Sequence, residues 1–274
     1  MIVDLPGAAR RWQANGRPAV VIEVVRTAGS VPREAGTRML VAADAVLGTI
    51  GGGHLELQAI AQARGLLASG GNEGGNVGGS DGGSVERHVA LGPSLGQCCG
   101  GALDLRYTPL AAADPAAWAA AAPRFHLQLY GAGHVGRAIA HLLAGIACRV
   151  QWIDERDDQF PPGIPAPHIE RLCVEPVQAE VKGAPPGAFY LVLTHSHDLD
   201  MAITLAILQR GDFGYFGLIG SRTKRARFEH RLRERGIGDD RLARMVCPIG
   251  VPGIAGKEPE VIAVAVVAQL LQAG

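Results

Sequence analysis

The first half of the chain combines short apolar runs with one longer stretch of helical spacing. The run at 19–25 is apolar and β-branched, which is typical of a buried strand. Helical spacing of apolar residues predicts a helix over 54–69. Residues 11–16 are predicted to form the end of an earlier helix. Further strands are predicted at 37–41, 45–50, 85–91 and 102–107. This half is therefore predicted to be an α+β domain.

The second half alternates strand-like runs with helical ones, which predicts a parallel sheet covered by helices. The strands are predicted at 125–130, 149–154, 188–194 and 215–219, and the helices at 135–146, 199–209, 223–235 and 259–269. The predicted fold class is thus α/β with two domains. An α+β N-terminal domain spans 1–108, and a Rossmann-like parallel sheet flanked by helices spans 124–274. The Ala- and Pro-rich stretch 109–123 is predicted to be a linker.

Composition excludes several classes of protein. The 26 lysines and arginines balance the 26 acidic residues, so bulk charge does not favour nucleic acid as a partner. The five cysteines form no C-x-x-C pair and indicate reduced thiols rather than a disulfide framework. The first 16 residues show no signal-peptide pattern, and the longest apolar run, 261–271, is about half the length that crosses a bilayer. We therefore expect a cytoplasmic protein that binds neither membrane nor nucleic acid.

A glycine fingerprint lies between the first predicted strand and the first predicted helix of the second domain. In this G-x-G-x-x-G, Gly131 suits a tight turn, Gly133 lets phosphates approach the backbone, and Gly136 lets helix and strand pack closely. Asp154 ends the next strand, where an acid accepts a hydrogen bond from a ribose hydroxyl. The pattern indicates a nucleotide site, so an NAD(P)-dependent oxidoreductase is one hypothesis for the function. The alternative is that the loop is inherited architecture that binds nothing.

Two glycine-rich turns occur in the first domain. The turn at 28–36 follows a predicted strand and contains Arg33. The turn at 48–54 leads into a predicted helix and carries three consecutive glycines, Gly51, Gly52 and Gly53. Backbone N–H groups at such turns can bind a phosphate, and an arginine strengthens that interpretation. The alternative is that both segments are only tight turns.

The segment G-Q-C-C-G-G at 96–101 places two thiols side by side on a glycine-flanked turn. A thiolate is both a soft metal ligand and a nucleophile, so Cys98 and Cys99 are candidate binding residues. The alternative is a buried pair at the start of a strand. The remaining cysteines lie in or beside apolar runs and are predicted to be core residues: Cys148, Cys173 and Cys247.

The segment T-H-S-H-D-L-D at 194–200 follows a predicted parallel strand, at the edge where open α/β sheets bind ligands. His195, His197 and Asp198 are candidate metal ligands, which gives a metal-dependent hydrolase as a further hypothesis. The favoured interpretation is that Asp198 caps the helix beginning at Leu199 while the segment lines the crevice.

Another strand-to-helix junction carries Arg222 and Lys224 at the start of a strongly basic segment, 221–236. These two side chains are candidate phosphate contacts at the edge of the sheet. The alternative is a solvated helix face with Arg–Glu pairs.

Taken together, the chain resembles the XdhC/CoxI family of xanthine dehydrogenase accessory proteins. Six motifs occur in the same order, namely G-S-V-P-R-E-A-G, G-T-I-G-G-G-H-L-E, G-Q-C-C-G-G, G-A-G-H-V-G-R, T-H-S-H-D and G-L-I-G-S-R-T-K-R. The segment P-I-G-V-P-G-I-A-G-K-E-P-E near the carboxyl end is similar as well. The resemblance covers nearly the whole chain, with 70–83 and 109–123 outside it.

The resemblance implies a non-catalytic carrier. XdhC proteins bind the molybdenum cofactor, in its molybdopterin form, protect it while its terminal sulfido ligand is installed, and pass it to apo xanthine dehydrogenase. The family's cofactor-associated cysteine matches Cys99, with Cys98 beside it, so Cys99 is the implied contact to molybdenum. The implied partners are the molybdenum-binding subunit of xanthine dehydrogenase, a cysteine desulfurase and a second copy of the chain. The phosphate tail of such a cargo suits the glycine turns together with Arg33, Arg222 or Lys224.

Overall fold

The structure is a computed structural model that describes residues 4–69, 83–92, 100–118, 122–163 and 166–274. It divides into two compact units, Val3–Ala120 and a C-terminal unit built from Ala121–Gly274. The division falls within the stretch 109–123. In the described part of the chain, no helix is both long and apolar enough to span a membrane.

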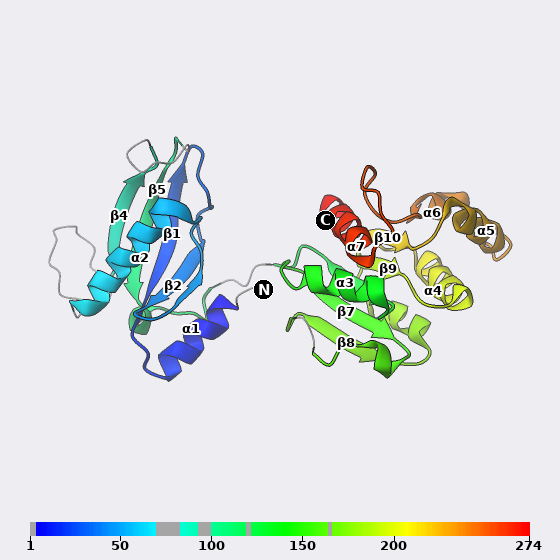
Figure 1. Ribbon diagram of the computed structural model, residues 1–274, viewed down its shortest axis with the longest axis horizontal. Coiled ribbons are helices and arrows are strands. Elements are labelled where there is room, and N and C mark those ends of the chain that lie inside the picture. Colours follow the sequence, from blue (N-terminus) through cyan, green and yellow to red (C-terminus); the bar gives the residue numbers. More distant parts are fainter. Residues whose placement is uncertain (1–3, 70–82, 93–99, 119–121, 164–165) are drawn as a thin grey trace. The chain divides into compact units, whose positions relative to one another are not determined.

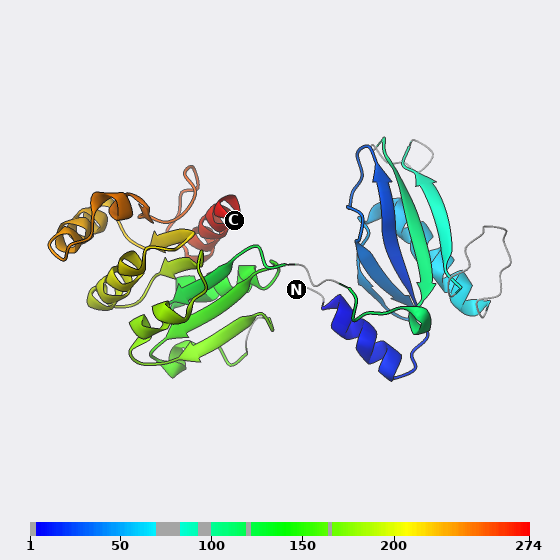
Figure 2. The ribbon, with the colours of Figure 1, turned by 180° about the vertical axis from the view of Figure 1, so that it is seen from behind.

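The N-terminal unit is a five-stranded antiparallel sheet with a helix on each face (Figures 1 and 2). The strand order is β3-β2-β1-β5-β4. Its elements are α1 (Leu5–Ala14), β1 (Ala19–Ala28), β2 (Arg38–Ala42), β3 (Val46–Gly48), α2 (Gly53–Ala68), β4 (Val85–Ala90) and β5 (Ala102–Pro109). The α+β class predicted for this half is confirmed.

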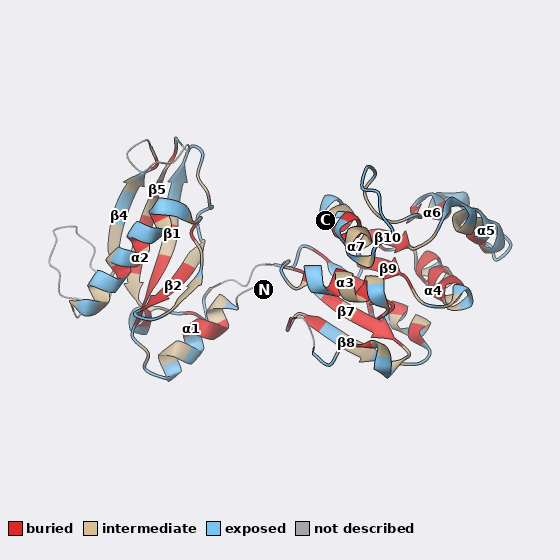
Figure 3. Ribbon diagram, in the orientation of Figure 1, coloured by how far each residue is buried: buried red, intermediate tan, exposed pale blue. Residues whose placement is uncertain are grey.

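The first half of the central strand β1 is buried on both faces, which explains its apolar run from Ala19 to Ile22. Val20, Ile22 and Val24 point into the core beneath α2, whereas Ala19 and Val21 point into the core beneath α1. Successive side chains of a strand alternate between faces, so a strand covered on both sides needs no polar positions. Figure 3 shows the resulting buried stripe along the sheet.

The first part of the predicted linker belongs to the N-terminal unit. Leu110 is buried against α1 and β1, and the Gln13 side-chain amide donates to the carbonyl groups of Leu110 and Ala113. The stretch therefore begins as a packed arm, because Leu110 adds apolar surface to the smaller core of the unit.

The C-terminal unit is a six-stranded, fully parallel sheet. Its elements are β6 (His126–Tyr130), α3 (His134–Leu143), β7 (Arg149–Asp154), β8 (Ile169–Cys173), β9 (Phe189–Val192), α4 (His197–Arg210), β10 (Tyr215–Leu218), α5 (Arg222–Arg233), α6 (Asp239–Ala243), β11 (Met245–Val246) and α7 (Pro259–Ala273). The strand order β11-β10-β9-β6-β7-β8 is the doubly wound order of a Rossmann fold. The fold class predicted from the sequence is confirmed.

Two apolar layers hold this sheet. Helices α3 and α7 cover one face, where Trp152 and Leu129 lie in the core. Helices α4, α5 and α6 cover the other face, where Tyr130 and Phe216 are buried. Three short elements were not predicted from the pattern: β8, α6 and β11. Strand β8 lies at the edge of the sheet, so only Ile169 is fully buried and no continuous apolar run marks it.

Candidate functional site

Three of the predicted motifs converge at one end of the N-terminal sheet. A Cβ on Gly101 would lie 2.6 Å from the Ala28 carbonyl oxygen and closer still to that of Ser30, so only glycine fits there. A Cβ on Gly51 would lie 2.5 Å from the Cβ of Pro32. Gly51, before α2, and Gly101, before β5, are therefore both packed against the turn after β1. Arg33 lies exposed on the first of these turns.

The two thiols of greatest interest, Cys98 and Cys99, lie outside the described residues. The described residues that follow them are Gly100, which is exposed, and Gly101, which is buried against the turn after β1. The carbonyl of Gly101 also accepts a hydrogen bond from the Leu91 amide. The turn after β1 therefore borders the described end of the cysteine segment.

The glycine turn before α2 already binds a carboxylate of the same chain, that of Glu56. One carboxylate oxygen of Glu56 accepts hydrogen bonds from the Thr49 hydroxyl (2.5 Å), the Ile50 amide (3.0 Å) and the Gly52 amide (3.2 Å). The Gly51 amide donates to the Thr49 hydroxyl. Two of the three glycines predicted to present free donors to a phosphate, Gly51 and Gly52, are therefore engaged. A glutamate in the first turn of a helix reaches back to these donors, as in a capping box.

We expect Glu56→Ala to lower the free energy of unfolding of the N-terminal unit by about 1–3 kcal/mol, because it strands three donors on one turn. Chemical denaturation followed by circular dichroism measures the loss. Glu56→Gln keeps an acceptor oxygen and is expected to lose less. Equal losses in the two variants would mean that packing, not the hydrogen bonds, is responsible.

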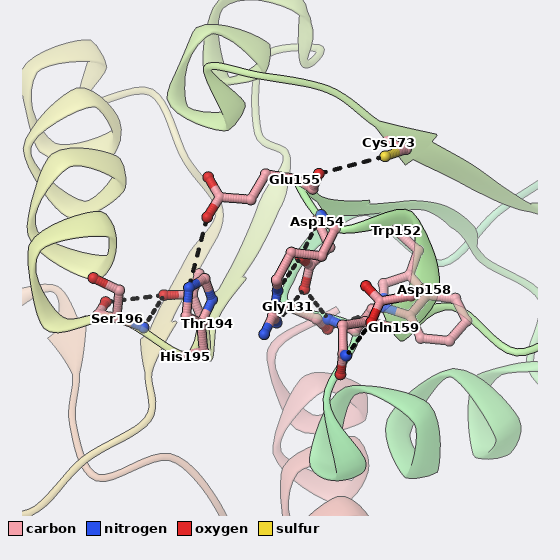
Figure 4. Close-up of polar contacts among 12 residues, drawn as sticks. Gly131, Trp152, Asp154, Glu155, Asp158, Gln159, Cys173, Thr194, His195 and Ser196 are labelled. Atoms are coloured by element: carbon pink, nitrogen blue, oxygen red, sulfur yellow. Dashed lines mark hydrogen bonds and ion pairs between the residues drawn. The ribbon is translucent and has the colours of Figure 1, made fainter.

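The second candidate site is the crevice of the C-terminal unit, at the carboxyl ends of β6 and β9, where the strand order reverses (Figure 4). A Cβ on Gly131 would lie 2.9 Å from the carbonyl carbon of Leu193, and Gly131 has a φ of +120°. A Cβ on Gly136 would lie 3.1 Å from the carbonyl carbon of Gly131. In the described residues, a Cβ on Gly133 meets no atom within 4 Å, and no side chain caps α3. The loop therefore has the close approaches and the open middle glycine of a phosphate-binding turn.

Asp154 is buried at the end of β7, with all of its acceptor capacity in use. Its oxygens accept from the Ala132 amide (2.7 Å), the Arg156 amide (3.0 Å) and two guanidinium nitrogens of Arg156 (each 3.0 Å). Burial opposes ionisation, but the hydrogen bonds from Arg156 and Ala132 prevail and lower the pKa of Asp154. The acid predicted to bind a ribose thus fixes the glycine loop and pairs with Arg156, which sequence analysis did not single out.

His195 and Glu155 face each other at the crevice, from the loops after β9 and β7. The Nε2 atom of His195 lies 3.6 Å from a carboxylate oxygen of Glu155. Because β6 lies between β7 and β9, this pair meets across the carboxyl end of β6, beside Gly131 (Figure 4). Glu155 was not predicted, although its place directly after Asp154 at the end of a parallel strand was a usable signal.

The helix cap predicted at Asp198 is wrong. The Ser196 hydroxyl accepts from the Leu199 amide at 3.4 Å, and α4 begins at His197, two residues earlier than expected. The Asp198 side chain is 90% exposed. Serine lies in the extended conformation that a cap requires, so it takes the role.

The metal site proposed for His195, His197 and Asp198 does not form within the described residues, where no three ligating side chains come together. Cys148 and Cys247 are buried, as predicted, but Cys173 is exposed. Cys173 ends the edge strand β8, which is covered on fewer sides than the central strands, and its thiol donates to the Glu155 carbonyl at 3.6 Å.

Lys224 does not present its ammonium group to the crevice as a free phosphate contact. Its Nζ donates to the Asp200 carboxylate (2.5 Å) and to the Ile219 carbonyl (2.8 Å), and the Lys224 side chain is only 11% exposed. The other Asp200 oxygen accepts from the amide and the hydroxyl of Thr194. This network fixes the loop after β9. Arg222, in contrast, is exposed at the start of α5.

Comparison with known proteins gives matches in both units. A family model described as the XdhC Rossmann domain matches residues 127–270, and one described as the XdhC and CoxI family matches residues 12–77. The uncharacterised protein YqeB of Escherichia coli strain K12 is 29% identical over 267 residues, which are 96% of this chain and 45% of YqeB. The chain thus spans about half the length of that curated relative.

A crystal structure described as a xanthine dehydrogenase from Bacillus halodurans has the same fold. The TM-score is 0.71 at 18% identity, and the match covers 99% of this chain and 96% of the other. Both units of the chain therefore have counterparts within a single solved protein.

Proposed function

Because the chain belongs to the XdhC and CoxI family, we propose that it is a non-catalytic accessory protein for xanthine dehydrogenase. Its cargo is the molybdenum cofactor, which it holds while the terminal sulfido ligand is installed and then delivers to the apo enzyme. A cysteine desulfurase and the molybdenum-binding subunit of the enzyme are its partners in this proposal, and a second copy of the chain completes the carrier.

The convergence of glycine turns in the N-terminal unit carries this proposal. Cys99 precedes Gly101 by two residues, and two trans peptide units span at most about 7 Å. Gly101 is packed against the turn that also carries the exposed Arg33. A cysteine two residues along the chain from this contact, together with the exposed guanidinium group of the turn, suits a ligand that has a soft metal at one end and a phosphate at the other.

The engaged donors of the second turn fit a carrier rather than a tight binder. The Gly52 amide already donates to Glu56, and the Lys224 ammonium group already donates to Asp200. Several of the predicted phosphate contacts are therefore engaged within the chain itself. A carrier must release its cargo. Affinity is low when few free contacts are available to offset the entropy that is lost on binding. Arg33 and Arg222 remain the exposed cations among the predicted contacts.

The test is cofactor retention by the full chain produced in a host that makes the cofactor. We expect Cys99→Ala to retain about tenfold less molybdenum and pterin than the wild type, which corresponds to the loss of about 1.4 kcal/mol. Cys173→Ala is the matched control, because it removes a different thiol, and Cys173 is exposed. Equal retention in both variants, or none in the wild type, would overturn the proposal.

A second candidate function is nucleotide binding in the Rossmann crevice, as in an NAD(P)-dependent oxidoreductase. The open position at Gly133 and the uncapped start of α3 among the described residues favour it. His195, paired with Glu155, is the group available for proton transfer beside such a ligand.

Titration with NADH tests this candidate. Since Arg156 saturates Asp154, we expect Arg156→Ala to bind NADH about two- to tenfold more tightly than the wild type, because it frees an acceptor for the ribose hydroxyls. Asp154→Ala removes that acceptor and is expected to bind most weakly. An absence of binding at millimolar nucleotide in all three proteins would eliminate the candidate.

A further inference from the structure

Helix α5 carries two flanks of opposite charge pattern. On one flank, Arg225, Glu229 and Arg233 follow one another at four-residue spacing, with ion-pair distances of 2.7 Å and 3.8 Å. On the other flank, Arg227 and Arg231 stand at the same spacing, and Arg235 follows in the turn after the helix. We call Arg227, Arg231 and Arg235 the arginine ridge.

The arginine ridge is exposed and almost unpartnered. Its one carboxylate neighbour in the described residues is Asp198, 4.0 Å from Arg231, and the Asp198 side chain is 90% exposed. Like charges four residues apart destabilise a helix, whereas opposite charges at the same spacing stabilise it. The paired flank shows that this helix accommodates glutamate at that spacing. Arg231 lies in the last turn of α5, where the helix dipole favours a cation, but the repulsion between Arg227 and Arg231 is not offset by a glutamate as it is on the paired flank.

The ridge is part of a strong local concentration of charge. Residues 222–244 contain nine lysines and arginines against four acids, although the whole chain has 26 of each. Asp198 belongs to the first turn of α4, directly after the segment with His195, so the ridge adjoins the loop that borders the crevice. The location is next to a candidate ligand site rather than on a remote surface.

We propose that the arginine ridge is a docking surface for an acidic patch on the protein that receives the cargo. This inference rests on the proposed accessory function. Guanidinium groups bind carboxylates through two parallel hydrogen bonds, which gives orientation as well as attraction. Complementary charge also speeds the encounter of two proteins that must meet only briefly.

The surroundings favour a protein over a nucleic acid as the occupant. Glu234, Asp239 and Asp240 follow the ridge in sequence and interrupt the positive charge, which suits a small acidic patch better than a continuous phosphate backbone. Phe228, the aromatic residue of α5, is buried, so it offers no platform for a base.

The experiment measures the affinity of the full chain for immobilised apo xanthine dehydrogenase at two salt concentrations. We expect Arg227→Glu/Arg231→Glu to bind at least about tenfold more weakly and to lose most of the salt dependence. The matched control is Arg124→Glu/Arg149→Glu, which makes the same change in net charge in the same unit. Arg149 is the first residue of β7, so it lies at the opposite end of the strands from the crevice. The control is expected to bind like the wild type.

Two outcomes would overturn the inference. Either the ridge variant binds the apo enzyme as the wild type does, or the wild type binds a 30-base-pair DNA duplex more tightly than the apo enzyme and the ridge variant loses that binding. Circular dichroism melts establish that both variants are folded. Cofactor content is measured separately, so a wild type without cofactor contradicts the proposed cargo, whereas the ridge is judged by protein binding alone.

Discussion

Replacing Gly131 with alanine is expected to lower the free energy of unfolding of the C-terminal unit by about 3 kcal/mol or more. Two costs add at this position. A Cβ would overlap the carbonyl group of Leu193, and overpacking costs about 1–3 kcal/mol. The φ of +120° is also unfavourable for any residue with a Cβ, at about 1–3 kcal/mol. Gly136→Ala brings only the first of these costs, through overlap with the Gly131 carbonyl, and is expected to lose about 1–3 kcal/mol.

The matched control lies in the same loop. Gly133 has a φ of −69°, and in the described residues its Cβ position is open, so Gly133→Ala is expected to change stability by less than about 1 kcal/mol. Trp152 reports the transition, because its indole N–H donates to the Gly131 carbonyl at 3.0 Å. Urea denaturation followed by fluorescence, with Trp12 and Trp118 both replaced by phenylalanine, isolates this signal. Identical midpoints for all three glycine variants would contradict the packing seen around the loop.

The same loop shows what a sequence can and cannot predict about this protein. The spacing of Gly131, Gly133 and Gly136 predicts a strand-to-helix turn because each glycine answers a backbone requirement, and such requirements are local. Whether Asp154 is free to bind a ribose depends on the side chain of Arg156, whose direction follows from packing after β7. Spacing alone carries no information on that.

Burial and hydrogen-bond occupancy set the other limits. Strand β1 was predictable because both faces of its first half are covered, whereas β8 was not, because an edge strand keeps polar positions. Glu56 and Asp200 each accept hydrogen bonds from donors that the sequence alone suggests are free to bind a ligand. An acid several residues away along a helix competes for the same groups as a ligand, and only the fold decides which of them wins.

Removing the ammonium group of Lys224 is expected to be as costly as any substitution in the crevice. The Asp200 side chain is 1% exposed, and Lys224 is its ion-pair partner at 2.5 Å. Lys224→Met keeps the length of the side chain but leaves a buried carboxylate with only the two donors of Thr194. Breaking one partner of a buried pair costs about 3–5 kcal/mol, because the remaining charge stays desolvated.

The double variant Asp200→Asn/Lys224→Met separates the charge from the packing. Asparagine keeps an oxygen for the amide and hydroxyl of Thr194, and no unpaired charge remains, so the double variant is expected to recover most of the stability lost by Lys224→Met. A double-mutant cycle by chemical denaturation gives the coupling energy directly. If the losses of the two single variants simply add, the pair has no net coupling, and the loop after β9 must be held by its packing against α4 instead.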